Sequence, residues 1–176
     1  MFAIDIAQLL ADKSVKAMQK RELIVEAVES GNVTVGELKA CAVDDKGLGI
    51  ILEAMEAVSR KNPEIASVDW LNFAGEQILS AANTVKREAS RVVGNIAHVF
   101  PDDVVSAVEK LMENAGNGAT VVRWASAYAL GRIVCIPRYM NGDLYNVVVD
   151  LAEKEKENGV KNQYLNGLKA ARRLRK

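Results

Sequence analysis

Three stretches of this chain repeat one pattern at nearly constant spacing. The clearest, residues 121–134, reads VVRWASAYALGRIV, and its apolar or small side chains recur three and four positions apart, as on one stripe of a helix. Related stretches begin at Val85 and Val160, which lie 37 residues before and 38 residues after Val122. Because one helical hairpin cannot bury its own apolar stripe, this period predicts a stack of helical repeats.

The shared pattern is a Val followed by Arg or Lys, then an Ala, then Leu-Gly-x-Ile or a close variant. It resembles the first helix of a HEAT repeat, the two-helix unit of the armadillo superfamily, over residues 85–176 and more loosely over residues 14–82. The resemblance implies an all-α fold, a right-handed alpha-alpha superhelix (HEAT-like solenoid) of about ten helices in four to five antiparallel pairs. It implies one domain, residues 1–176, that acts as a non-enzymatic scaffold or adaptor.

Apolar spacing and turn residues place ten expected helices along the chain. Their ranges are 1–11, 15–29, 33–43, 47–59, 68–82, 85–99, 101–114, 121–136, 143–157 and 160–176. Ser14 and Thr84 are expected N-caps, and Pro101 is expected in the first turn of its helix. The helices that begin at Val85, Val121 and Val160 are assigned as the first helices of their pairs.

Equivalent positions in the repeated stretches carry the same type of residue, which indicates the same structural role in each copy. Gly94 and Gly131 stand at equivalent places in their helices, where glycine costs about 1 kcal/mol relative to alanine. We therefore expect a neighbouring helix to approach closely at both. Lys86, Arg123 and Lys161 also match one another, and the resemblance implies that such a side chain packs its stem and bonds neighbouring loops.

Charge and composition narrow the classes of function. Lys plus Arg and Asp plus Glu balance at 23 each, which disfavours a general nucleic-acid binder because phosphate neutralisation normally requires a basic excess. No stretch has the composition of a signal peptide or approaches the roughly 18 apolar residues of a membrane span. We expect a cytoplasmic protein without membrane contact, with Cys41 and Cys135 as buried reduced thiols.

No residue pattern points to catalysis. The single histidine, His98, has no cysteine, aspartate or second histidine at a spacing typical of a triad or metal site. The expectation is therefore no catalytic residue, no metal and no cofactor. Two alternatives stay open: a DNA-binding or DNA-repair solenoid resembling the HEAT-like alkylpurine glycosylases, and an accessory factor or lyase for a prosthetic group.

Charge is distributed unevenly within each expected pair. The second helices, residues 64–77, 102–113 and 143–157, each carry three more acids than bases, whereas the first helices at Val85 and Val121 each carry two more bases than acids. In the resembling family the second helices usually line the concave surface, so we expect an acidic concave groove that binds a basic protein segment.

The residues expected in this groove are acids, one serine and aromatic anchors. They are Asp69, Trp70, Glu76, Asp102, Ser106, Glu109, Glu113, Tyr145 and Asp150. An exposed aromatic residue is a typical anchor for a partner. Packing of Trp70 and Trp124 in the core is the alternative interpretation.

Overall fold

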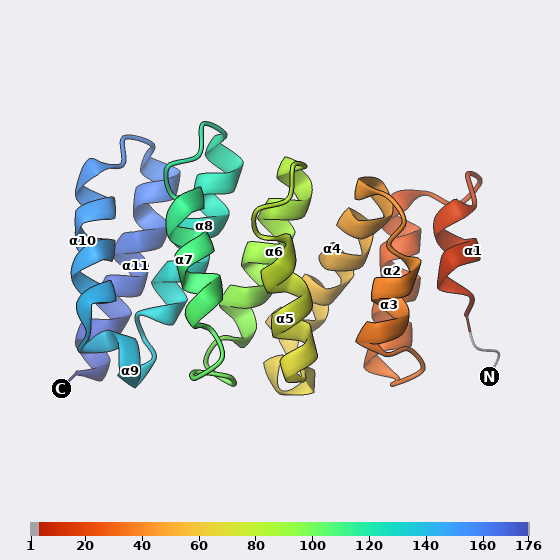
Figure 1. Ribbon diagram of the computed structural model, residues 1–176, viewed down its shortest axis with the longest axis horizontal. Coiled ribbons are helices and arrows are strands. Elements are labelled where there is room, and N and C mark those ends of the chain that lie inside the picture. The colour runs from red at the N-terminus through yellow and green to blue at the C-terminus, as the bar shows by residue number, and fades with distance from the viewer. Residues whose placement is uncertain (1–3, 176) are drawn as a thin grey trace.

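The computed structural model describes residues 4–175, and over this range the fold is all-α. The helices stand in a row of two layers along the longest dimension of the molecule (Figure 1). Their bounds are α1 Ile6–Ala11, α2 Ala17–Glu29, α3 Val35–Cys41, α4 Asp45–Lys61, the 3-10 helix η1 Pro63–Ile65, α5 Val68–Gln77, α6 Asn83–Ile96, α7 Val105–Asn114, α8 Thr120–Ile133, α9 Pro137–Met140, α10 Asp143–Lys154 and α11 Asn158–Leu174. The expected helix over residues 1–11 begins outside the described residues.

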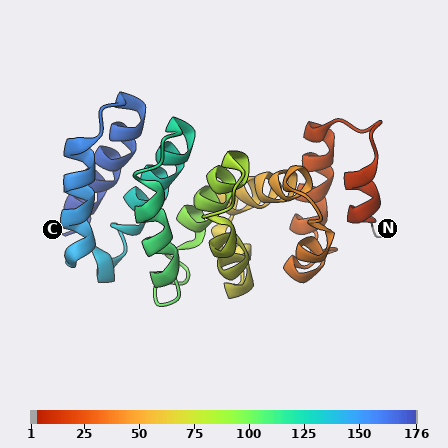
Figure 2. The same ribbon diagram turned by 45° about the horizontal axis from the view of Figure 1, so that its top comes forward.

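The two layers differ in how tightly their helices pack. In one layer α2, α4, α6, α8 and α11 follow one another, and each packs directly on the next. The other layer, α3, α5, α7 and α10, lies in front of it in Figure 1 and remains separate from it in the turned view of Figure 2. Of these, α5, α7 and α10 each pack on a helix of the first layer and make few contacts with one another.

The order within the helix pairs differs from the one expected from sequence. The helices that begin near Val85, Val121 and Val160 pack on the helix before them, which gives the pairs α5–α6, α7–α8 and α10–α11. Each is therefore the second helix of its pair, and the assignment as first helices was wrong. The connections explain the correction: only five residues separate α5 from α6, whereas the turn containing Pro101 separates α6 from α7.

Several helix ends also differ from the sequence prediction. Ser14 does not cap α2, because its backbone N–H and its hydroxyl both donate to the carboxylate of Asp12 in the preceding turn. Thr84 lies inside α6, whose N-cap is Ala82. Pro101 lies in a turn before α7, and the short helices α9 and η1 were not expected.

Glycines bring the backbones of α6, α8 and α11 into contact, as predicted for Gly94 and Gly131. A Cβ added to Gly94 would lie 2.8 Å from the Cα of Ala129, and one added to Gly131 would lie 2.8 Å from the carbonyl oxygen of Gln163. Gly167 of α11 lies directly against Gly131. No larger residue fits at these crossings without moving a helix, so the small residues determine how closely this layer packs.

None of the described helices is long and apolar enough to cross a membrane.

Candidate functional site

The acids predicted to bind a basic segment lie on α5, α7 and α10, except Asp102, which lies in the turn before α7. Each of these predicted polar residues has an exposed side chain: Asp69, Glu76, Asp102, Ser106, Glu109, Glu113 and Asp150. Two of them already have partners, since Glu76 pairs with Lys39 at 2.7 Å and Asp102 pairs with Arg138 at 2.9 Å. The other predicted acids thus lie on the layer whose helices make few contacts with one another.

The two predicted aromatic anchors are core residues. Trp70 is 5% exposed and Tyr145 is 8% exposed. The hydroxyl of Tyr145 accepts a hydrogen bond from Arg172 at 2.9 Å, and the guanidinium of Arg175 covers its ring. Neither ring is therefore free to insert into a partner. Trp70, with Asp69, does line a cavity of about 400 Å³ beside the turn between α2 and α3.

The opposite, closely packed layer carries a buried ion network between α4 and α6. The carboxylates belong to Glu56, 4% exposed, and Glu88, 1% exposed. Arg91 bridges them, with one guanidinium nitrogen 2.8 Å from Glu56 and another 3.1 Å from Glu88. Arg87 contacts Glu88 at 2.6 Å and Arg60 contacts Glu56 at 3.2 Å. Because buried charges are costly unless paired, this network holds Arg91 in one position.

Arg91 is the first member of a row of cationic and aromatic groups that continues onto α8. Its guanidinium lies 5.9 Å from the ring centroid of Trp124. Trp124 stacks on Tyr128 with centroids 5.6 Å apart, and the guanidinium of Arg132 lies 5.0 Å from the Tyr128 ring. Both aromatic rings are half-buried, so part of each remains accessible.

Hydrogen bonds link this row to the helices beneath it. The Tyr128 hydroxyl donates to the amide oxygen of Asn95, and the amide nitrogen of Asn95 donates to the hydroxyl of Ser59 at 3.1 Å. The chain of contacts runs from α8 through α6 to α4. Burial raises the pKa of the Tyr128 hydroxyl, so it remains a hydrogen-bond donor at neutral pH.

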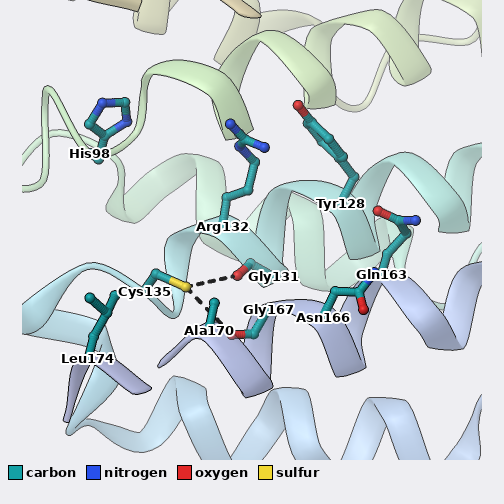
Figure 3. A pocket seen from close by; sticks show the side chains of 11 residues that line it. His98, Tyr128, Gly131, Arg132, Cys135, Gln163, Asn166, Gly167, Ala170 and Leu174 are labelled. Atoms are coloured by element: carbon teal, nitrogen blue, oxygen red, sulfur yellow. Dashed lines mark hydrogen bonds between the residues drawn. The ribbon is translucent and has the colours of Figure 1, made fainter. Parts of the chain in front are cut away.

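A groove lies beside the row, between α6, α8 and α11 (Figure 3). It consists of two cavities of about 570 and 370 Å³ that share His98, Arg132 and Cys135. The larger extends along α11 past Gln163 and Asn166, and the smaller extends to Arg138 of α9. We call the surface that lines these two cavities the α8–α11 groove. Its floor is the crossing of Gly131 and Gly167, where the absence of side chains leaves space.

Several polar side chains in the groove have no hydrogen-bond or ion-pair partner within residues 4–175. The side chains of Arg132, His98, Gln163 and Asn166 make no hydrogen bond and no ion pair there, and Figure 3 shows Gln163 and Asn166 on α11, across the groove from His98. Cys135 is partly satisfied, with its sulfur 3.5 Å from the carbonyl oxygens of both Gly131 and Gly167. Burial raises the pKa of this thiol.

Arg123 has the structural role that the resemblance implies. Its guanidinium donates to the carbonyl oxygens of Asn117 and Gly118 in the turn before α8, and it pairs with Glu155 at 3.1 Å in the turn before α11. It thereby ties the ends of two neighbouring pairs together. Its matches in the other copies, Lys86 and Lys161, form no such bond in the described part of the chain.

Both cysteines are free and partly buried. Within residues 4–175 no three histidine, cysteine, aspartate or glutamate side chains gather where they would hold a metal ion.

Sequence reasoning missed the row on α8, although a signal was present. Trp124, Tyr128 and Arg132 recur four residues apart, which places them on one face of a single helix. The same helix carries a continuous apolar stripe, and core packing was the interpretation offered for Trp124, while Tyr128 and Arg132 were not assigned to a site. A stripe that ends in an arginine is a better indication of a face that reaches solvent.

The chain was compared with known proteins. No family model and no curated protein sequence matches it. Among solved structures, the crystal structure of an engineered protein is similar, with a TM-score of 0.56 over 97% of this chain and 98% of that one, at 14% sequence identity. At this identity the likeness concerns the fold alone, and a shared fold does not carry function with it.

Proposed function

We propose that this protein is a non-enzymatic protein-binding scaffold whose helices form a right-handed superhelix of the HEAT type. In a curved stack of helix pairs the inner arc is the shorter one, so its helices pack more closely. The layer of α4, α6, α8 and α11, with its backbone contacts at glycine, fits the inner position. The α8–α11 groove then lies on the concave side, and the acidic helices α5, α7 and α10 lie on the convex side.

The observation that carries the proposal is the composition of the surface beside the groove. Trp124, Tyr128, Arg91 and Arg132 are residues of the types most enriched at the energetic centres of protein interfaces. They are also preorganised, because Arg91 is held by buried carboxylates and Tyr128 is held by Asn95. A partner bound here loses little free energy to ordering of this surface.

This surface differs from the one expected from sequence. A basic segment bound to the acidic layer is the earlier expectation, and it has less support because Trp70 and Tyr145 are buried and α5, α7 and α10 do not pack together. Binding of DNA is the other candidate for a groove with aromatic and arginine side chains. It has less support because Glu56 and Glu88 neutralise Arg91 and its neighbours. The free cysteines fit a reducing compartment such as the cytoplasm.

Selection from a displayed peptide library tests the proposal. The immobilised full chain is expected to enrich peptides that occupy the α8–α11 groove. Ala170 lines the groove and is exposed on α11, so Ala170→Gln adds volume there without charge. We expect this change to weaken the enriched peptides at least about tenfold, which corresponds to about 1.4 kcal/mol of binding free energy.

The matched control is Ala40→Gln, the same substitution at an exposed position of α3 far along the row of helices. It is expected to leave binding unchanged. Trp124 lies close to the groove, so its fluorescence provides a second readout in a Trp70→Phe background. If no peptide is enriched over the bare support, the groove is not the binding surface. The same holds if the enriched peptides bind Ala170→Gln and Ala40→Gln equally well.

A further inference from the structure

The charged residues of the α8–α11 groove indicate which kind of partner protein it binds. We propose that the groove binds an acidic segment of a partner protein, with carboxylates on Arg132 and Arg138 and apolar side chains against Ala170 and Leu174. This inference rests on the proposed function, and adds the chemistry of the partner to it. It reverses the charge expected from sequence, which placed a basic segment on the acidic helices.

Arg132 lines the groove and is ready to bind an anion. Its guanidinium has no ion pair within the described residues, and it is positioned by the Tyr128 ring at 5.0 Å. A guanidinium on an aromatic face keeps its nitrogen–hydrogen bonds free at the edge, where they match the two oxygens of a carboxylate. Arg132 is therefore a charged donor already oriented for an acidic side chain.

No buried acid competes with a partner's carboxylate among the described residues that line the groove. The carboxylate that lines the groove is Asp102, which pairs with Arg138 at 2.9 Å. Both side chains are open to water, at 86% and 52% exposure, so this pair is weak and a carboxylate of the partner can replace it. His98 lies in both cavities, and it carries no negative charge that would oppose an acid.

Charge is separated between the two layers of the molecule. The chain is neutral overall, and acids dominate the exposed positions of α5, α7 and α10. An acidic segment is therefore repelled by that layer and attracted to the groove, which improves both the rate and the orientation of encounter. A basic segment meets Arg132 and Arg138 in the groove and is excluded from it.

A nucleic acid is a different partner with the same charge sign. Its phosphates form a continuous line, whereas the arginines of α6 on this layer are already paired with acids. Toward α4, Arg91 pairs with Glu56 and Glu88. Arg87 lies 3.6 Å from Glu53. An extended phosphate backbone would pass over these acids, so a short acidic protein segment fits the surface better.

The test uses labelled short peptides that share their apolar residues and differ only in Glu, Ser or Lys at the remaining positions, with a labelled short DNA as a fourth probe. Fluorescence anisotropy is measured with the full chain at low and at physiological ionic strength. We expect the acidic peptide to bind most tightly and to weaken as salt rises. We expect Arg132→Glu to weaken it at least about tenfold and Arg132→Gln to weaken it less.

Lys46→Glu is the matched control, because it makes the same charge change at an exposed position of α4 outside the groove. It should change the affinity for the acidic peptide by no more than about twofold. Circular dichroism and the unfolding temperature verify that each variant is folded.

The possible failures are distinguishable. In one outcome, Ala170→Gln weakens the binding of library peptides, but these peptides are uncharged or basic and Arg132→Glu does not change their affinity. The acidic partner is then wrong and the scaffold function stands. If DNA binds more tightly than the acidic peptide and loses affinity with Arg132→Glu, the groove is a nucleic-acid site and both proposals fail. If Ala170→Gln changes neither the affinity of any library peptide nor that of the acidic peptide, both proposals fail as well.

Discussion

Replacing Gly167 with alanine should destabilise the protein, although alanine is the better helix former. An added Cβ would overlap the Cα, carbonyl carbon and carbonyl oxygen of Gly131. A neighbouring contact at the same crossing gives the scale: a Cβ on Gly131 would lie 2.8 Å from the carbonyl oxygen of Gln163, also on α11. An ordinary carbon–oxygen contact is longer by roughly 0.5–0.8 Å. Both obstacles are backbone, so no rotamer change relieves them, and α8 and α11 have to separate.

Overpacking of this kind costs about 3 kcal/mol at the upper end of the usual range, and the helix propensity of alanine offsets about 1 kcal/mol. The expected net loss for Gly167→Ala is therefore about 2 kcal/mol, which lowers the unfolding temperature by roughly 4–8 °C in a chain of this size. Thermal unfolding followed by circular dichroism measures the shift.

Gly75→Ala is the matched control for this prediction. Gly75 lies inside α5, and an added Cβ would meet no atom within 4 Å. Only the propensity gain remains, so we expect Gly75→Ala to raise the unfolding temperature by about 2–4 °C. The two substitutions should thus move stability in opposite directions. An unfolding temperature that rises equally in both variants would refute the claim that the crossing at Gly131 excludes a side chain.

Three further predictions concern buried polar groups and a thiol. Asn114→Ala removes the 2.6 Å hydrogen bond to the buried carbonyl of Ile78, so the unfolding free energy measured in urea should fall by about 1–3 kcal/mol. Burial raises the pKa of Glu155, but hydrogen bonds from two backbone N–H groups and from Arg123 outweigh it and hold the pKa below its ordinary 4.5. Its stabilising contribution is complete above pH 4.5 and is lost as the pH falls through the lowered pKa, so Glu155→Gln should flatten the acid limb of a plot of stability against pH. Burial raises the pKa of the Cys135 thiol, so it should react with a disulfide reagent at pH 8 more slowly than the same thiol in the urea-unfolded chain, and equal rates would contradict this.

The sequence predicted the positions of the helices better than it predicted which helices pack together in pairs. Apolar spacing located ten of the eleven α-helices of the described chain, because burial of one stripe leaves a period that is visible without the fold. The same spacing says nothing about which neighbour covers the stripe. The helix at Val85 was therefore paired with the wrong neighbour, although the short connection before it and the turn with Pro101 after it indicate the correct one.

The pairing of the helices also decides which side of the molecule is expected to carry the binding surface. If the helices at Val85 and Val121 are first helices, their arginines face outward on the convex side and the acids of α7 line the groove. Once they are second helices, Arg91 and Arg132 lie on the closely packed layer, and Asp102 is left at the edge of the groove as the partner of Arg138. Charge counts along the chain were accurate throughout. The meaning of these counts depended on one topological choice that local periodicity does not determine. The contacts of α6 with α5, of α8 with α7 and of α11 with α10 determine it.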